Sequence, residues 1–203
     1  MRGSFWILCA ISMIATGAFI LLALFAMSFY LVEWLIFSDL IALQISQPLR
    51  DNAFQFAWVD RYTVYIAILA INAAWFYQTT AKSIARRGQT FASTPTWATL
   101  YFFIPLVNLY APFLMTRRKW NLSVNPELQP DAPAPSFFWV WWLSWLMSLM
   151  MYQWLPEYAQ QQDWNTAYAT IAGYAAIGAG AELIAAVCFI HIQRTVSAAL
   201  LQN

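Results

Sequence analysis

One carboxylate lies deep in an apolar stretch of this sequence, where ionisable groups usually have a function. Glu182 stands near the middle of the apolar residues 166–191. A charged side chain at the centre of a bilayer costs about 2.5–3.5 kcal/mol on insertion scales, so it must face other helices, be paired or be protonated. Asn72 and Asn108 are candidate partners, and with them Glu182 would form a proton or cation site. The alternative is an interhelical hydrogen bond that serves packing alone.

A second candidate is the proline-rich core that surrounds Asn108. Asn108 lies three residues after Pro105 and four before Pro112, and Trp97 stands at the entry to this segment. Each proline removes a backbone N–H, and the Asn108 amide has the reach to satisfy carbonyls that are freed in this way. Irregular backbone at membrane depth is tolerated where it packs in protein or lines a wet cavity. The core therefore predicts either a structural hairpin or a polar lining for a ligand or ion.

Two sets of side chains have the types and spacing of binding surfaces. The aromatic set shares one helical face and predicts a stacking surface for a partner or cofactor: Phe138, Trp141, Trp142 and Trp145. The basic set predicts contacts with anionic lipid headgroups: Arg86, Arg87, Arg117, Arg118 and Lys119. Aromatic belts and the positive-inside rule explain the same residues without any specific ligand.

Known catalytic and metal-binding patterns are missing from the sequence. It contains no P-loop, GxGxxG, HExxH or CxxC pattern, and its single histidine, His191, stands apart from Cys9 and Cys188. We therefore expect no enzymatic activity, no metal site and no resident cofactor. A bound lipid, quinone or pigment remains compatible with the aromatic face.

The composition identifies the class of protein in which these residues must be positioned. Of the 203 residues, 62% are hydrophobic and 9% are charged, and the net charge is +1. A soluble domain carries about 25% charged residues, and a nucleic-acid-binding protein needs a basic excess. The composition therefore excludes both classes and indicates an integral membrane protein.

Four apolar stretches have, or nearly have, the roughly 20 residues that a membrane-spanning helix needs. They are residues 5–30, 62–80, 137–155 and 166–191. A fifth, residues 97–115, contains Pro105 and Pro112. If it enters and leaves on one side, all basic residues except Arg50 and Arg61 share the cytoplasmic side. We predict an all-α integral membrane protein with four transmembrane helices and a proline-broken re-entrant or interfacial segment at 97–115. A five-helix bundle is the alternative.

The remaining organisation follows from this topology. A single membrane domain covers residues 1–203, both termini are cytoplasmic, and a proline-rich cytoplasmic linker occupies residues 121–136. Small residues recur at spacings of four in the last span, at positions 172, 176 and 180 and at 175 and 179. Such stripes let helices approach closely, and we expect them to pack within this chain rather than on another subunit.

The middle of the chain resembles a known family. Its motifs are WFYQTTAKSIARRG, STPTWATLYFFIPLVNLYAPFLMTRRKWNLS and FFWVWWLSWLMSLM. They resemble the bacterial membrane domain-of-unknown-function family catalogued as four-three-two-eight. The matching positions are Pro95, Trp97, Phe103, Ile104, Pro105, Asn108, Leu109, Pro112, Arg118, Trp120, Trp141 and Trp142. The resemblance implies a bacterial membrane protein and no established activity.

We therefore expect a non-enzymatic bacterial inner-membrane protein that serves as an accessory, assembly or scaffolding subunit of a larger membrane complex. Its expected partners are membrane lipids and other integral membrane subunits, with no nucleic acid. The alternative is a small proton- or cation-coupled transporter or channel that uses Glu182 with Asn72 and Asn108.

Overall fold

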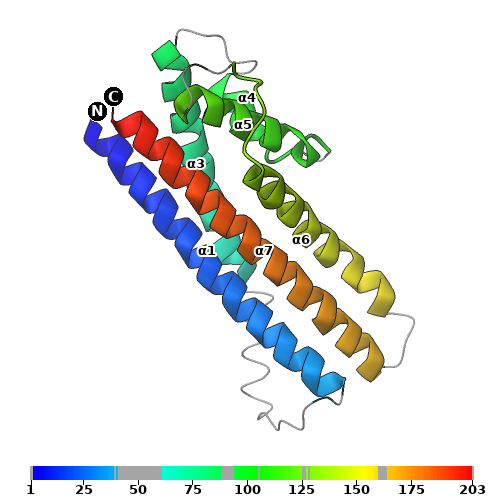
Figure 1. Cartoon of the computed structure of the whole chain (residues 1–203). Coiled ribbons are helices and arrows are strands. Elements are labelled where there is room, and N and C mark those ends of the chain that lie inside the picture. The colour runs from blue at the N-terminus through cyan, green and yellow to red at the C-terminus, as the bar shows by residue number, and fades with distance from the viewer. Residues whose placement is uncertain are drawn as a thin grey trace. The chain divides into compact units, whose positions relative to one another are not determined.

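The structure, a computed structural model, describes residues 2–38, 40, 61–87, 94–104, 106–124, 127, 129–159 and 164–202. These residues form six α-helices and one short 3-10 helix, and they contain no strand. In chain order the helices are α1 (Arg2–Phe37), α3 (Arg61–Arg87), α4 (Pro95–Leu100), η2 (Val107–Leu109), α5 (Ala111–Val124), α6 (Phe137–Ala159) and α7 (Trp164–Leu201) (Figure 1). The predicted all-helical fold class is confirmed.

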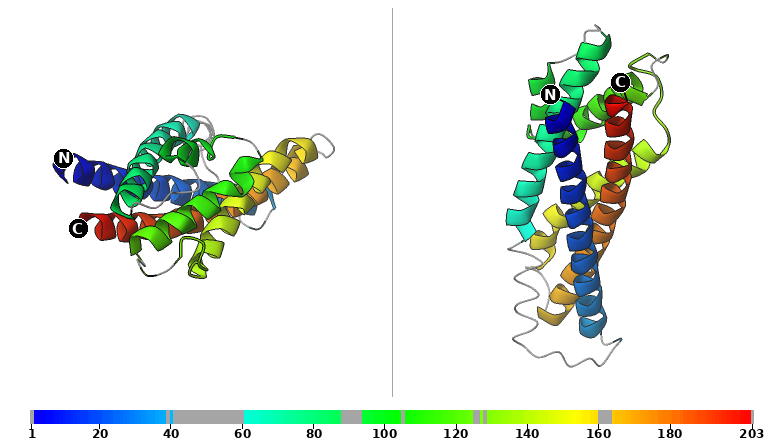
Figure 2. Two further views of the ribbon diagram at one scale, coloured as in Figure 1. Left: turned by 90° about the horizontal axis from the view of Figure 1, so that it is seen from above. Right: turned by 90° about the vertical axis from the view of Figure 1, so that its left-hand side faces the viewer.

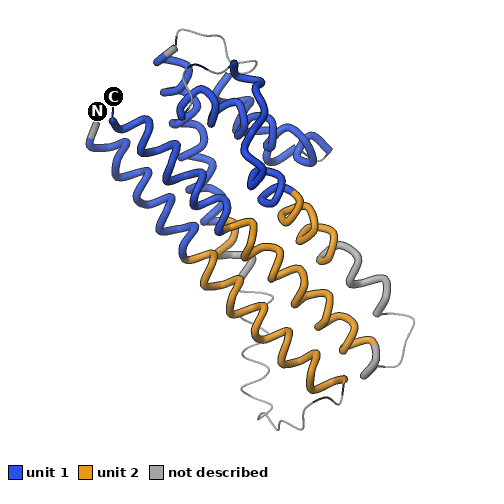
Figure 3. Tube along the Cα trace, in the orientation of Figure 1, with its two compact units in different colours: residues 1–17, 67–142, 187–203 blue, residues 18–66, 143–186 orange. Residues whose placement is uncertain are grey.

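The chain divides into two compact units (Figure 3). Unit 1 contains residues 1–17, 67–142 and 187–203, and unit 2 contains residues 18–66 and 143–186. The helices α1, α3, α6 and α7 each contribute residues to both units. The single membrane domain expected for residues 1–203 stays a prediction.

Two of the described helices are long and apolar enough to cross a membrane. They are the stretches Gly3–Phe37 of α1 and Ala167–Leu201 of α7, while Phe137–Met151 of α6 is apolar but shorter. The helices α1 and α7 contain the predicted spans 5–30 and 166–191, and both helices are longer than predicted. His191 therefore lies inside α7 and not at its end. Residues 62–80 lie within α3 and residues 137–155 within α6, and their role as spans stays a prediction.

The segment 97–115 is broken, as predicted. The α4 helix begins at Pro95 after Thr94, whose side chain accepts a hydrogen bond from the Trp97 amide. The helix ends at Leu100, and regular α-helix resumes only at Ala111. Pro112 lies in the first turn of α5, where a missing backbone N–H costs nothing. The re-entrant or interfacial placement of this segment stays a prediction.

The predicted linker 121–136 begins too early. The α5 helix continues through Val124, and its Asn121 side chain is buried. The Asn121 amide donates hydrogen bonds to the carbonyl oxygens of Pro130 (3.1 Å) and Ala132 (2.8 Å). These bonds hold the returning chain against the last turn of α5, so that turn stays helical. Within 121–136, the described residues are irregular only after Val124 and before α6 begins at Phe137.

In unit 1, the first turns of α1 lie beside the last turns of α7, and both termini are at the same end (Figure 2). Trp75 and Phe76 of α3 are fully buried in this unit together with Phe138 and Ile192. The Trp75 ring meets Phe189 edge to face, with ring centroids 5.8 Å apart. This aromatic core surrounds the polar side chains described below.

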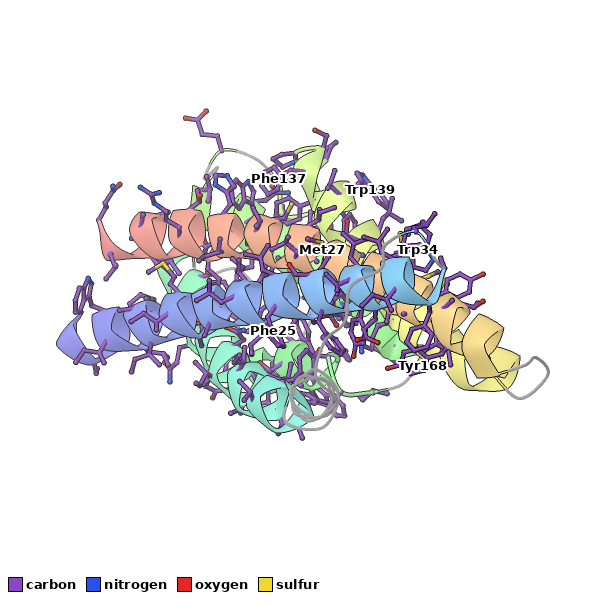
Figure 4. The ribbon with its side chains drawn as sticks, turned by 90° about the horizontal axis from the view of Figure 1, so that it is seen from below. Phe25, Met27, Trp34, Phe137, Trp139 and Tyr168 are labelled. Atoms are coloured by element: carbon purple, nitrogen blue, oxygen red, sulfur yellow. The ribbon has the colours of Figure 1, made fainter. Side chains whose placement is uncertain are left out.

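In unit 2, small residues of α7 pack against α1. Ala175 and Ala179 are fully buried with Ala26 and Tyr30. A Cβ atom added at Gly173 would lie 3.1 Å from Trp34 Cδ1, so only a glycine fits there without displacement. The predicted packing of the small-residue stripe within this chain is confirmed for Ala175 and Ala179. Figure 4 labels Trp34 of α1 and Tyr168 of α7, which also belong to this unit.

Candidate functional site

Polar side chains of unit 1 follow one face of α3. Asn72, Thr79, Ser83 and Arg86 recur at spacings of three, four and seven residues, which places them in a row along the helix. Each of them contacts a side chain or carbonyl from another helix of the unit. We call these residues the polar row, and the polar contacts between helices of unit 1 that are described next lie along it.

The first part of the row is an amide–hydroxyl network around Asn72. The Asn72 Oδ1 atom accepts hydrogen bonds from Ser12 Oγ (2.7 Å), Thr16 Oγ1 (3.3 Å) and Gln193 Nε2 (2.8 Å). Gln193 Nε2 also donates to Ser12 Oγ at 2.7 Å. This network ties α1, α3 and α7 together, and it fully occupies the acceptor capacity of the Asn72 carbonyl.

Two further polar contacts continue the row along α3. The indole Nε1 of Trp75 donates to Ser197 Oγ of α7 at 3.0 Å. The hydroxyls of Ser83 and Ser123 lie 2.9 Å apart and join α3 to α5. Each contact satisfies a buried polar group with a partner on another helix, which fixes the register of the helices.

The central feature of the row is the side chain of Lys119, which is 0% exposed. Its Nζ donates to Thr79 Oγ1 at 3.2 Å. The same atom lies 3.4 Å from the centroid of the Phe76 ring and 4.0 Å from that of the Trp75 ring. We call Trp75, Phe76 and Thr79 the lysine cage. All three cage residues come from little more than one turn of α3.

Two opposing effects act on the charge of Lys119. Burial lowers its pKa well below the ordinary value of 10.5, because the ammonium form loses its hydration. An unpaired buried ion costs several kcal/mol. The two ring faces act against this, since a desolvated cation–π contact contributes about 2 kcal/mol. Burial is the larger effect, so the caged amine releases its proton more readily than a lysine in water.

The structure contradicts the expectation that Lys119 binds lipid headgroups. Apart from Lys119, each residue of the basic set whose side chain the structure describes has a partner within the chain. Arg118 Nε lies 2.5 Å from Asp131 Oδ1, Arg117 Nη2 lies 3.7 Å from the same oxygen, and Arg86 donates to the Ala199 carbonyl at 2.8 Å. The side chain of Arg87 lies outside the described residues. The hydrogen bond from Arg118 lowers the pKa of Asp131 below its ordinary 3.8.

The predicted stacking surface on α6 is also corrected. Three of its residues lie inside unit 1 with exposed fractions of 0%, 5% and 4%: Phe138, Trp141 and Trp142. The Trp141 ring stacks on Phe189, with centroids 5.7 Å and planes 18° apart, and Phe138 meets Trp120 edge to face. Burial of these rings removes apolar surface from water and forms ring–ring contacts, so the rings belong to the core of their own chain. Trp145 belongs to unit 2 and is half-buried.

Among the exposed aromatic residues of α6 is Trp139, whose side chain is 54% exposed. Figure 4 labels it beside Phe137 on the same helix. The Phe137 ring contacts His191, whose ring centroid lies 5.1 Å away.

Within the part of the chain that the structure describes, no three His, Cys, Asp or Glu side chains are grouped to hold a metal.

The three predicted ligand or ion residues are placed as follows. Asn72 and Asn108 belong to unit 1, and Glu182, which is half-buried, belongs to unit 2. Asn72 bonds to the network described above, and the structure does not give Asn108 as one of its partners. The Asn108 Oδ1 atom is buried without a hydrogen-bond partner, while its backbone N–H donates to the Ile104 carbonyl at 2.8 Å. The neighbouring Pro105 lies outside the described residues.

Unit 2 contains a shallow apolar groove of about 340 Å³. Its walls come from α1 and α7 and include Leu31, Trp34, Gly173 and Ile177. The close approach at Gly173 shapes one side of the groove. Apolar walls of this kind suit a hydrocarbon chain rather than a polar solute.

Sequence reasoning missed most of the polar row of unit 1. The residues that it missed as partners are Ser12, Thr16, Thr79, Ser83, Ser123, Gln193 and Ser197. The available signal was the four-residue spacing of Ser12 and Thr16, of Thr79 and Ser83, and of Gln193 and Ser197 within apolar helices. Such spacing places polar side chains on one helical face, which then needs a polar partner.

A family model described as "Domain of unknown function (DUF4328)" matches residues 43–198 of the chain. The match includes all the motifs on which the resemblance was based and extends beyond them on both sides. No curated protein and no solved structure matches this chain.

Proposed function

This chain belongs to the DUF4328 family, a domain of unknown function, and we propose that it is a non-enzymatic accessory, assembly or scaffolding subunit of a larger complex in the bacterial inner membrane. In this proposal α1, α3, α6 and α7 cross the bilayer, and the segment 97–115 enters one leaflet or lies along its surface. Both termini face the cytoplasm. Membrane lipids and other integral membrane subunits are its partners.

The membrane location is supported by the surface of the chain. Two of the helices that the structure describes are apolar and long enough to span a bilayer. No Asp, Glu, Lys, Arg or His occurs between Arg87 and Arg117. Large side chains along that segment are exposed, namely Trp97, Leu100, Phe103, Leu106, Leu109 and Tyr110. Exposure of large apolar side chains to lipid costs little free energy, whereas their exposure to water costs much more. The segment therefore suits the bilayer or its interface.

The observation that carries the non-transporting role is the saturation of Asn72. Its carbonyl oxygen already accepts hydrogen bonds from Ser12, Thr16 and Gln193. An ion that bound there would have to displace donors whose other bonds hold α1, α3 and α7 together. The network therefore supports a packing role within the helix bundle, and the outer apolar surface is left for lipids and other subunits.

The rival function is a small proton- or cation-coupled transporter or channel. The observation in its favour is the buried Asn108 oxygen, which has no hydrogen-bond partner. In that function Glu182 would carry the proton or bind the cation together with Asn72 and Asn108. Glu182 lies in unit 2 and the two asparagines lie in unit 1.

Isolation from native membranes in mild detergent, followed by native mass spectrometry, tests the proposal. We expect a complex that contains this chain and at least one other integral membrane protein at a fixed stoichiometry. A lone chain would contradict the proposal. In parallel, the purified chain is placed in liposomes and proton flux is recorded. Flux that is lost in Glu182→Gln but kept in the matched control Glu127→Gln would establish the rival function.

A further inference from the structure

Lys119 is a buried amine whose neighbours are fixed by the fold. It lies on α5, outside the four predicted spans, and its cage lies on α3. The side chain is fully buried, and among the described residues it has no carboxylate partner. The contact therefore joins two helices through one titratable group, which is a different arrangement from a surface ion pair.

The lysine cage offers electron-rich groups to the amine. The Thr79 hydroxyl donates its proton to the Trp75 carbonyl at 2.7 Å, so a lone pair of Thr79 Oγ1 faces Lys119 Nζ. The rings of Phe76 and Trp75 present their π faces at 3.4 Å and 4.0 Å. These partners tolerate an ammonium group, although full burial disfavours the charge. The cage therefore accommodates both the neutral amine and the ammonium form. The pH determines which of these two forms has the lower free energy.

In unit 1, the other charged side chains that the structure describes on α3, α5 and α7 have their own partners or are exposed, and the Cys9 thiol of α1 acts on Lys119. From α1, the Cys9 thiol acts electrostatically on Lys119. From α3, Lys82 Nζ lies over the Phe5 ring at 3.5 Å and Arg86 bonds to the Ala199 carbonyl. Of the remaining charged or titratable groups, Arg117 and Arg118 of α5 pair with Asp131, His191 and Arg194 of α7 are exposed, and Glu182 of α7 belongs to unit 2.

We propose that Lys119 is a proton-linked latch, in which α5 docks on α3 with the neutral amine in the lysine cage and proton uptake by the amine shifts the equilibrium toward the undocked state. In the undocked state Lys119 is in water and has its ordinary pKa of 10.5. In the docked state its pKa is lower, so docking releases a proton. Docking becomes more favourable as the pH rises between the two pKa values. The latch concerns contacts within unit 1 and does not depend on the accessory role proposed above.

Linkage gives the size of the effect. One proton is taken up on undocking at pH values between the docked pKa and 10.5, so the opening equilibrium constant of α5 rises tenfold for each pH unit of acidification in that window. Below the docked pKa both states are protonated and the constant no longer changes. Above 10.5 both states are neutral and it is again constant.

Hydrogen exchange measured by mass spectrometry on the α5 peptide, residues 111–124, tests this prediction in the detergent-solubilised chain. Rates from pH 6 to 10 are corrected for intrinsic exchange. The wild-type opening constant should rise tenfold per pH unit of acidification over part of this range. Lys119→Met and Lys119→Arg should each remove the pH dependence, because neither side chain titrates there. Lys82→Met, the matched control, should keep it. A flat wild-type profile, or an unchanged slope in both Lys119 variants, would overturn the proposal.

A second measurement needs no substitution, because Lys82 and Lys119 are the only lysines in the chain. Trace acylation with acetic anhydride at a series of pH values gives the reactivity of each amine. We expect Lys119 to react more slowly than Lys82 and to titrate with a midpoint below 10.5. Equal rates and an ordinary midpoint for both lysines would contradict the latch.

Discussion

At Asn72, one carbonyl oxygen accepts hydrogen bonds from three side chains on two other helices. Each bond inside a membrane helix bundle contributes about 0.6 kcal/mol on average. The larger consequence is specificity, because a rotation or slide of α3 would leave several buried polar groups unsatisfied at once. An amide in an apolar helix therefore fixes how its helix meets the neighbouring helices.

Replacement of this amide should be costly. In Asn72→Leu the Gln193 amide and the Ser12 hydroxyl lose their shared acceptor, and buried groups left without partners cost about 1–3 kcal/mol of the free energy of unfolding. Gln78→Leu makes the same chemical change at an exposed position of α3 and should cost less than about 0.5 kcal/mol. Unfolding in detergent micelles measures both values. Equal losses in the two variants would argue against the network.

The broken segment 97–115 shows how prolines shape an element. Pro95 and Pro112 stand in the first turns of α4 and α5, so they begin helices more than they interrupt them. Between these helices, Leu106 adopts a φ of 66°, which L-amino acids other than glycine rarely occupy. Its side chain is 81% exposed, so it gains little from protein packing in return. Leu106 therefore forms the turn before η2 at a cost in backbone strain.

Leu106→Gly should therefore stabilise the chain. Glycine adopts a positive φ without the steric cost of about 1–2 kcal/mol that a side chain incurs, although the unfolded chain gains entropy. We expect the free energy of unfolding in micelles to rise by up to about 1 kcal/mol. Leu109→Gly, in the neighbouring η2, provides the control and should lower it. A loss of stability in Leu106→Gly would mean that the exposed side chain matters more than the backbone strain.

Close packing between α1 and α7 in unit 2 depends on small residues. A larger side chain at position 173 would meet Trp34, so Gly173→Leu should lower the free energy of unfolding by about 1–3 kcal/mol. The matched control is Gly17→Leu, because a Cβ at Gly17 meets nothing within 4 Å. Thermal unfolding in micelles distinguishes them. If Gly173→Leu unfolds at the wild-type temperature, the α1–α7 contact is looser than the structure gives.

For the whole molecule, the distribution of charge underlies the proposed topology. The net charge of the chain is only +1, yet the basic clusters at 82–87 and 117–119 flank a charge-free segment. A segment that returns to its own side keeps both clusters in the cytoplasm, in agreement with the positive-inside rule. A segment that crosses the bilayer separates them.

Single-cysteine labelling distinguishes the two topologies. In a background without Cys9 and Cys188, we place cysteines at the exposed positions 3 and 129, as Gly3→Cys and Gln129→Cys. With four spans, both sites lie in the cytoplasm and a membrane-impermeant maleimide labels them only after the membrane is opened. Labelling of position 129 alone in intact spheroplasts would show that residues 97–115 cross the bilayer.

The sequence by itself determined the all-helical class, the apolar stretches within α1 and α7, the interruption of regular helix within 97–115 and the family. Hydropathy, helix length and proline act locally, so each of these features is readable from a short stretch of chain. It did not determine that Lys119, Phe138 and Trp141 are buried. The rotation of a helix about its axis and the neighbours that cover it depend on distant segments. A basic residue next to two arginines therefore looked like a surface residue until the tertiary structure placed α3 against it.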